Sequence, residues 1–148
     1  MSLKQQLQDD LKVAMLARDE LRKRTLRLTL AAVKNKEVEV GHALSDAEVA
    51  QVLQKEAKQR RETLDELARA DRPDLAAAEQ AELAVLETYL PEQLDRDEIA
   101  EQARQVIDET AAKGPRDMGR VMGALMPRLQ GRADGKVVSQ VVRELLSA

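Results

Sequence analysis

The sequence predicts an all-α protein made of two small helical units. Three observations support this fold class. The composition is rich in the helix formers Ala, Leu, Glu, Arg and Gln, apolar residues recur every three or four positions, and helix caps alternate with helix breakers. We expect an N-terminal unit of about four helices arranged as helical hairpins, residues 1–90, and a small orthogonal three-helix bundle, residues 91–148.

Two helices are predicted in the first forty residues. In the first helix, which ends near Arg18, apolar positions follow helical spacing: Leu3, Leu7, Leu11 and Ala14. Asp19 can cap the second helix, whose apolar arc is wide enough to place it at the centre of the first unit. The segment 40–43 contains Gly41 and interrupts the pattern.

A third and a fourth helix complete the first unit. Ser45 and Glu48 match a capping box, in which each side chain accepts a hydrogen bond from the other residue's backbone N–H. The middle of the third helix, QKEAKQRRE, is almost entirely polar. Pro73 lies in the first turn of the fourth helix, and the unit ends at Leu90 because a residue before proline disfavours helix.

Three further helices are predicted in the second unit. Asp95 and Glu98 match a second capping box, and Gly114-Pro115 ends the fifth helix. We expect Asp117 to cap the sixth helix and Asp134 to cap the seventh. Valines recur every four residues in the last helix, and this spacing favours helix although valine is β-branched.

Two glycines, Gly119 and Gly123, lie one turn apart in the predicted sixth helix. Each costs about 1 kcal/mol relative to alanine in a helix interior. We expect the close approach of another backbone to offset this cost, and a neighbouring helix is favoured over a nucleic acid. On this hypothesis, Gly119→Ala and Gly123→Ala each destabilise the fold.

The inventory of reactive side chains argues against a free-standing enzyme. The chain has one histidine, His42 in a predicted loop, no cysteine, and no serine in a G-x-S-x-G turn. A metal site would have to consist of carboxylates alone, and no helix carries an E-x-x-H pair. We therefore expect no catalytic residue, no metal and no cofactor.

The N-terminal segment has no apolar run, and no stretch of the sequence is long and apolar enough to span a membrane. The lack of cysteine fits a reducing compartment. We expect a soluble cytoplasmic protein with no membrane partner, and the sequence leaves its oligomeric state open.

Charge is distributed unevenly along the second unit. Residues 113–143 carry seven basic and two acidic side chains, a net charge of +5. Residues 91–112 carry two basic and seven acidic side chains, a net charge of −5. A second basic stretch, residues 18–36, has seven basic and two acidic residues. Such charges commonly form solvated helix faces, but clustered cations can also contact nucleic-acid phosphates.

The turn at residues 131–136, GRADGK, allows two interpretations. It lacks the spacing, the Ser or Thr and the preceding strand of a nucleotide-binding loop. Gly131 and Asp134 can serve as the C-cap of one helix and the N-cap of the next. Alternatively, Arg132 and Lys136 flank an anion site at the start of the last helix, where Asp134 would compete with the anion.

Several segments resemble the GatB/YqeY family: residues 89–94 (YLPEQL), 117–123 (DMGRVMG), 126–129 (MPRL) and 131–136 (GRADGK), together with 34–37 (KNKE) and 54–62 (QKEAKQRRE). The similarity covers essentially the whole chain and is most specific from Tyr89 to Leu146. The family contains stand-alone proteins of this length. It also contains the C-terminal tail of the B subunit of the glutamine-dependent tRNA amidotransferase, which converts Glu or Asp on misacylated tRNA to Gln or Asn.

The resemblance implies a tail-like module that engages tRNA without performing the chemistry, because the catalytic part of that subunit has no counterpart in this chain. We therefore expect a non-catalytic, tRNA-associated accessory module. The expected phosphate contacts lie in the basic stretch of the second unit: Arg116, Arg120, Arg128, Arg132 and Lys136. Tyr89 is the only aromatic residue and is expected to be buried where the two units join. RNA would therefore be held by its backbone and shape, not by base stacking.

Two alternatives remain open. A protein–protein adaptor would bind another translation-related protein through its polar helix faces. A role as a component of a carbon–nitrogen ligase with glutamine as amido-N donor is implied by family association only. Binding of bulk tRNA separates the accessory module from the adaptor, and ammonia transfer to misacylated tRNA tests the ligase.

Overall fold

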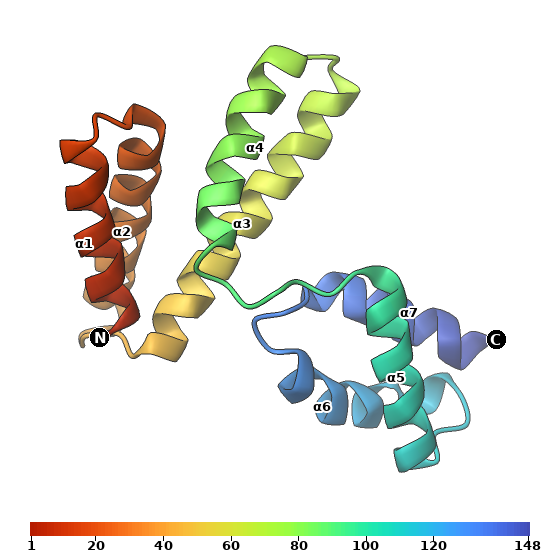
Figure 1. Cartoon of the computed structure of the whole chain (residues 1–148). Helices are drawn as coiled ribbons and strands as arrows, with labels where there is room; N and C mark the ends of the chain where they lie inside the picture. Colours follow the sequence, from red (N-terminus) through yellow and green to blue (C-terminus); the bar gives the residue numbers. More distant parts are fainter. The chain divides into compact units, whose positions relative to one another are not determined.

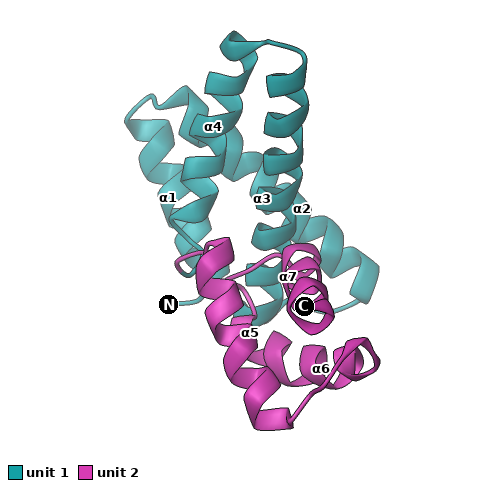
Figure 2. Ribbon diagram, turned by 90° about the vertical axis from the view of Figure 1, so that its right-hand side faces the viewer, with its two compact units in different colours: residues 1–91 teal, residues 92–148 magenta.

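The computed structural model describes all residues, 1–148, and confirms the all-α fold class. The chain divides into two compact units, a first unit of residues Met1–Pro91 and a second unit of residues Glu92–Ala148 (Figures 1 and 2). The boundary expected from the sequence lies one residue earlier. None of the helices combines the length and the hydropathy needed to cross a membrane.

The first unit contains four helices, α1 (Leu3–Leu16), α2 (Glu20–Val40), α3 (Asp46–Arg69) and α4 (Pro73–Glu87). The helix α1 packs mainly against α2, and α3 packs mainly against α4 (Figure 1). Side chains cap three of the helix starts, because the first N–H groups of a helix have no partner within it. Asp19 caps α2, and Ser45 and Glu48 form the predicted capping box on α3. Gly41 ends α2 in the left-handed conformation, with φ +78°.

The core of the first unit is mostly apolar but also buries two threonines of α2, Thr25 and Thr29, and one ion network. Its buried apolar residues include Leu7, Leu26, Val33, Val49, Leu53, Ala57, Leu83 and Leu86. Within this core, Glu82 of α4 is 7% exposed. Its Oε1 accepts a hydrogen bond from Arg24 Nη2 of α2 at 2.5 Å, and its Oε2 pairs with Arg60 of α3. The network therefore joins three helices.

Tyr89 is held within the first unit, at the end of α4. Its hydroxyl donates to Asp10 Oδ2 at 2.5 Å and accepts from Arg22 Nη2 at 3.3 Å. Burial and the hydrogen bond to Asp10 raise the pKa of Tyr89 to about 12. The expectation from the sequence placed this ring where the two units join. The residues that hold it belong to α1 and α2, so its observed role is to tie these helices to the end of α4.

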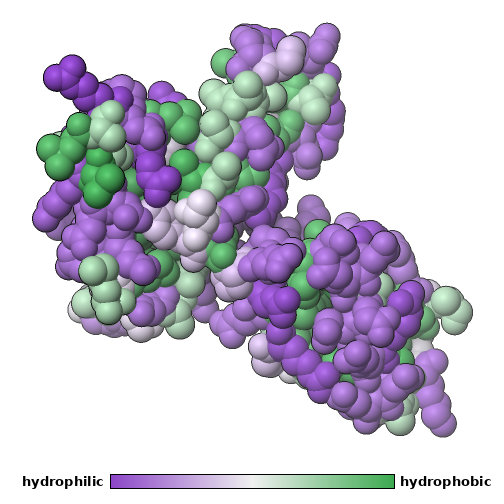
Figure 3. Space-filling view, in the orientation of Figure 1, coloured by the Kyte–Doolittle hydropathy of each residue, from purple (hydrophilic) through white to green (hydrophobic).

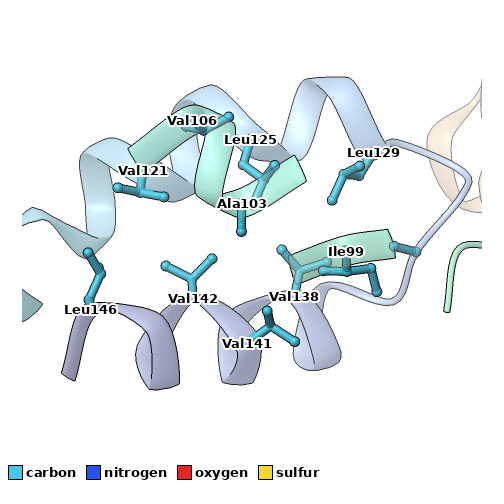
Figure 4. Packing of buried hydrophobic residues seen from close by; sticks show 11 residues of the cluster. Ile99, Ala103, Val106, Val121, Leu125, Leu129, Val138, Val141, Val142 and Leu146 are labelled. Carbon is cyan, nitrogen blue, oxygen red and sulfur yellow. The ribbon is translucent and has the colours of Figure 1, made fainter. Parts of the chain in front are cut away.

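The second unit contains α5 (Arg96–Thr110), a short 3-10 turn η1 (Pro115–Asp117), α6 (Met118–Leu129) and α7 (Gly135–Ser147). Each of the three α-helices packs against the other two. Their inward faces form an apolar core (Figure 4): Ile99, Ala103, Val106, Val121, Leu125, Leu129, Val138, Val141, Val142 and Leu146. No polar or charged side chain is buried in this unit.

The prediction that Asp117 caps α6 is wrong. Because η1 leads directly into α6, Asp117 has a near-helical backbone (φ −91°, ψ 4°), whereas a capping residue needs an extended one. Its carboxylate instead accepts a hydrogen bond from the Lys113 N–H at 2.8 Å and pairs with Arg120 at 3.2 Å. Asp117 therefore fixes the loop before α6.

The expected backbone neighbour of Gly119 and Gly123 is absent. A Cβ atom added at either glycine would meet no heavy atom within 4 Å beyond the helix's own backbone. Both glycines are exposed, because the buried positions of α6 lie on its other side. The hypothesis that alanine destabilises these positions therefore loses its basis.

Candidate nucleic-acid interface

The five predicted phosphate contacts come from consecutive elements of the second unit. Arg116 lies in η1, Arg120 and Arg128 lie on α6, Arg132 lies in the turn between α6 and α7, and Lys136 lies in the first turn of α7. All five residues are exposed. The structure therefore leaves each of them accessible, but it gives them different partners.

Arg120 and Arg128 already pair with carboxylates. Arg120 contacts Asp117, and Arg128 of α6 makes a two-contact ion pair with Glu109 of α5, in which the longer contact joins Nη1 and Oε1 at 3.3 Å. The hydrogen bond from Arg128 lowers the pKa of Glu109, and the Lys113 N–H lowers the pKa of Asp117. Both carboxylates are therefore ionised at neutral pH and neutralise the arginines beside them.

The ion pairs of the second unit involve four cations: Arg96, Arg104, Arg120 and Arg128. The other five take part in none of these pairs: Lys113, Arg116, Arg132, Lys136 and Arg143. Two of these five, Lys113 and Arg143, are not among the predicted phosphate contacts, although both count towards the net charge of residues 113–143. On α7, Lys136 and Arg143 are seven residues apart, so two helical turns bring them to the same side.

The turn between α6 and α7 is hydrogen-bonded to the segment before α5. Gly131 has a left-handed backbone, φ +80°, and its carbonyl accepts from the Gln93 side-chain amide at 2.8 Å. The Arg132 carbonyl accepts from the Leu94 N–H, also at 2.8 Å. These two bonds join the turn that carries Arg132 to the segment before α5.

The start of α7 fits the capping interpretation of this turn. Asp134 is the N-cap residue, and its carboxylate accepts from the Lys136 N–H at 3.0 Å. An anion at this position would have to displace a carboxylate of the chain itself. The side chains of Arg132 and Lys136, rather than the helix N-terminus, are therefore the groups available to a phosphate.

The outward side of α5 carries the opposite charge. Asp97, Glu101 and Asp108 are exposed there, and Arg104 is paired with Glu101 at 3.8 Å. Arg96 and Arg104 are the only basic residues of α5, which carries five acidic ones, whereas Asp117, Asp134 and Glu144 are the only acidic residues after it. A polyanion would be attracted by the segment after α5 and repelled by the exposed carboxylates of α5.

The structure shows no cluster of metal-ligating side chains, and its single histidine lies at the surface. No three His, Asp or Glu side chains come together as metal ligands would. The single histidine, His42, is exposed, and its Nδ1 lies 2.9 Å from the adjacent Ala43 carbonyl oxygen.

Comparison with known proteins confirms the resemblance seen in the residues. The pattern of the family described as "Yqey-like protein" matches residues 4–146. Similar proteins are named "Altered inheritance of mitochondria protein 41, mitochondrial". The one from Lachancea thermotolerans is 36% identical and the one from Vanderwaltozyma polyspora is 38% identical, each over 85 residues. These matches cover 57% of this chain and 46% of each relative, so the chain spans about half the length of the curated relatives it matches.

The names of these relatives place them in mitochondria, so a cytoplasmic location for this chain remains a prediction. The family match extends over both helical units and includes every segment in which the resemblance was noted. The chain belongs to the YqeY-like family.

Proposed function

We propose that this protein is a non-catalytic accessory module that holds tRNA by its backbone and shape, through the basic segment of its second unit, residues 113–143. The observation that carries the proposal is the set of cations without a carboxylate partner described above. Arg116, Arg132 and Lys136 belong both to this set and to the contacts predicted from the sequence. Exposed, unpaired Lys and Arg side chains are the groups that neutralise phosphates and release counterions.

The kind of RNA follows from what the chain lacks. Sequence-specific recognition of single strands needs aromatic side chains on which bases can stack. The only aromatic residue, Tyr89, is held by Asp10 and Arg22 in the first unit. The mode of binding left to this chain is contact with the backbone of a folded RNA. The family's relation to the tail of the tRNA amidotransferase makes tRNA the first candidate. Participation in that carbon–nitrogen ligase is a separate alternative, which rests on family association alone.

One observation favours the adaptor as a second candidate. Val13 and Leu16, in the last turns of α1, are 63% and 86% exposed. Hydrophobic side chains gather at this end of α1 in Figure 3. Exposed apolar side chains of this kind serve contacts with proteins rather than with phosphates. An adaptor is expected to have no affinity for tRNA at any salt concentration.

Fluorescence anisotropy with labelled bulk tRNA, between 50 and 200 mM salt, tests the proposal. With three to five phosphate contacts, the slope of log K against log salt should be roughly −2 to −4. Neutralising two cations, Arg132→Gln with Lys136→Gln, should flatten this slope by about 1 to 2.

A matched control removes two cations elsewhere in the same unit, Arg96→Gln with Arg104→Gln. Both lie on α5 and are ion-paired. The control changes the net charge by the same amount, but its salt slope should stay equal to that of the wild type. Failure of the wild type to bind at 50 mM salt would contradict the proposal. So would equal slopes for the two double variants.

A further inference from the structure

Two carboxylates lie at the border of the basic segment, each against an arginine of α6. Glu109 lies near the end of α5 and pairs with Arg128. Asp117 lies in η1 and pairs with Arg120 at 3.2 Å. The two arginines belong to the positively charged part of the unit, whereas Glu109 comes from the acidic helix. The structure thus places an internal anion on each of two expected phosphate contacts.

These ion pairs can open. The side chains of Arg128 and Glu109 are 41% and 53% exposed, and those of Arg120 and Asp117 are 55% and 29% exposed. Pairs between exposed side chains contribute little to stability, so an RNA phosphate can compete for the arginine. Both carboxylates have a lowered pKa, so they compete at neutral pH in their charged form.

Resting on the proposed function, we propose that Glu109 and Asp117 are specificity-determining residues that reserve Arg128 and Arg120 for an RNA already anchored by the unpaired cations. A carboxylate on the same chain is present at a high effective concentration, so a short or weakly held anion does not displace it. An RNA bound at Arg116, Arg132 and Lys136 presents its next phosphates at a similarly high effective concentration. Only such a ligand gains the two further contacts.

The test removes the internal anions while preserving side-chain shape, with the double variant Glu109→Gln, Asp117→Asn. The asparagine oxygen can still accept the Lys113 N–H, so the loop before α6 is retained. With an octauridylate strand, which does not displace the carboxylates of the wild type, two freed arginines should make the salt slope steeper by about 1 to 2, whereas the slope for tRNA, which already gains both contacts, should change little. The preference for tRNA over an octauridylate strand should fall about fivefold, since the short strand gains the arginines without displacing a partner.

The matched control is Glu101→Gln with Asp108→Asn. It removes the same two charges from the exposed side of α5, where Glu101 pairs with Arg104 outside the basic segment. Binding of tRNA by the wild type together with equal octauridylate slopes for both double variants would overturn the role of Glu109 and Asp117 and leave the proposed function intact. An unchanged preference for tRNA over octauridylate would overturn it as well. Absence of tRNA binding by all three proteins at 50 mM salt would instead overturn the proposed function itself.

Discussion

The two units use charge in opposite ways. In the first unit, Glu82 is buried among apolar residues and joins Arg24 and Arg60 from two other helices. In the second unit, every buried side chain is apolar and all charges lie at the surface. Charge therefore helps to hold the first unit together, whereas the charges of the second unit can change or meet a partner without disturbing its core.

The buried network is the most sensitive point of the first unit. The side chain of Arg60 is only 12% exposed, and its Nε has no hydrogen-bond partner. The guanidinium therefore depends on Glu82, and on Glu79 at 3.3 Å, for compensation of its charge. Removing one member of a buried ion pair is far more costly than losing an exposed pair, because the other charge is left without compensation.

The largest effect is expected for Glu82→Gln, which keeps the size of the side chain but removes its charge. It should lower the free energy of unfolding of the first unit by about 3 kcal/mol, measured by urea denaturation. The matched control is Glu87→Gln on the same helix. Its pair with Arg61 is exposed, so its loss should cost at most about 0.5–1 kcal/mol. Equal effects of the two variants would show that the buried network contributes no more to stability than an exposed ion pair.

A second prediction compares one substitution in both units. Gly123→Ala should stabilise the second unit by about 1 kcal/mol, because alanine favours helix and the added Cβ meets open space. Gly119→Ala should help less, because this residue lies in the first turn of α6. In the first unit, Gly41→Ala should destabilise by about 1 kcal/mol, since its φ of +78° is strained for any residue with a Cβ.

Thermal unfolding of the single variants measures these opposite signs. A lower melting temperature for Gly123→Ala would mean that another chain packs on the outer side of α6, for example in a self-association. If the melting temperature rises but the affinity for tRNA falls, we would conclude that the RNA backbone packs closely against the glycine side of α6.

Local features of the fold could be predicted from the sequence, and features that depend on distant partners could not. The caps at Asp19, Ser45, Asp95 and Asp134 are found as predicted, because a cap bonds only within its own first turn. Of the box predicted at Asp95 and Glu98, the structure shows the bond that the Asp95 carboxylate accepts from the Glu98 N–H. Asp117 was mistaken for a cap because the spacing of apolar residues does not reveal the 3-10 turn before α6.

The candidate site shows the same limit. Exposure of the five predicted cations followed from charge and helical period, but the ion pair of Arg128 with Glu109, 19 positions away, depends on how α5 packs against α6. Likewise, the polar stretch QKEAKQRRE in α3 contains Arg60, whose partners Glu79 and Glu82 come from α4. No periodicity in one helix identifies a partner on another.

The last and smallest effect concerns Tyr89, where the first unit again uses a polar contact between helices. Tyr89→Phe removes the hydroxyl that joins Asp10 and Arg22, and it should cost about 1 kcal/mol, because the site is only partly buried. The folded-state pKa, about 12, lies above the ordinary value of 10.0. The contribution of the hydroxyl is therefore fully present below pH 10 and is lost as the pH rises towards 12.

As Tyr89 is the only aromatic residue, tyrosinate absorbance reports its ionisation directly. The native protein should titrate at about pH 12 and the urea-unfolded protein near pH 10. Asp10→Asn should shift the native midpoint towards 10, since it removes the negative charge that opposes ionisation of the phenol. A native midpoint already near 10 would mean that the hydroxyl is solvated and that the end of α4 is not tied to α1. In that case the polar ties of the first unit would be limited to the Glu82 network, and Tyr89→Phe should leave the free energy of unfolding unchanged.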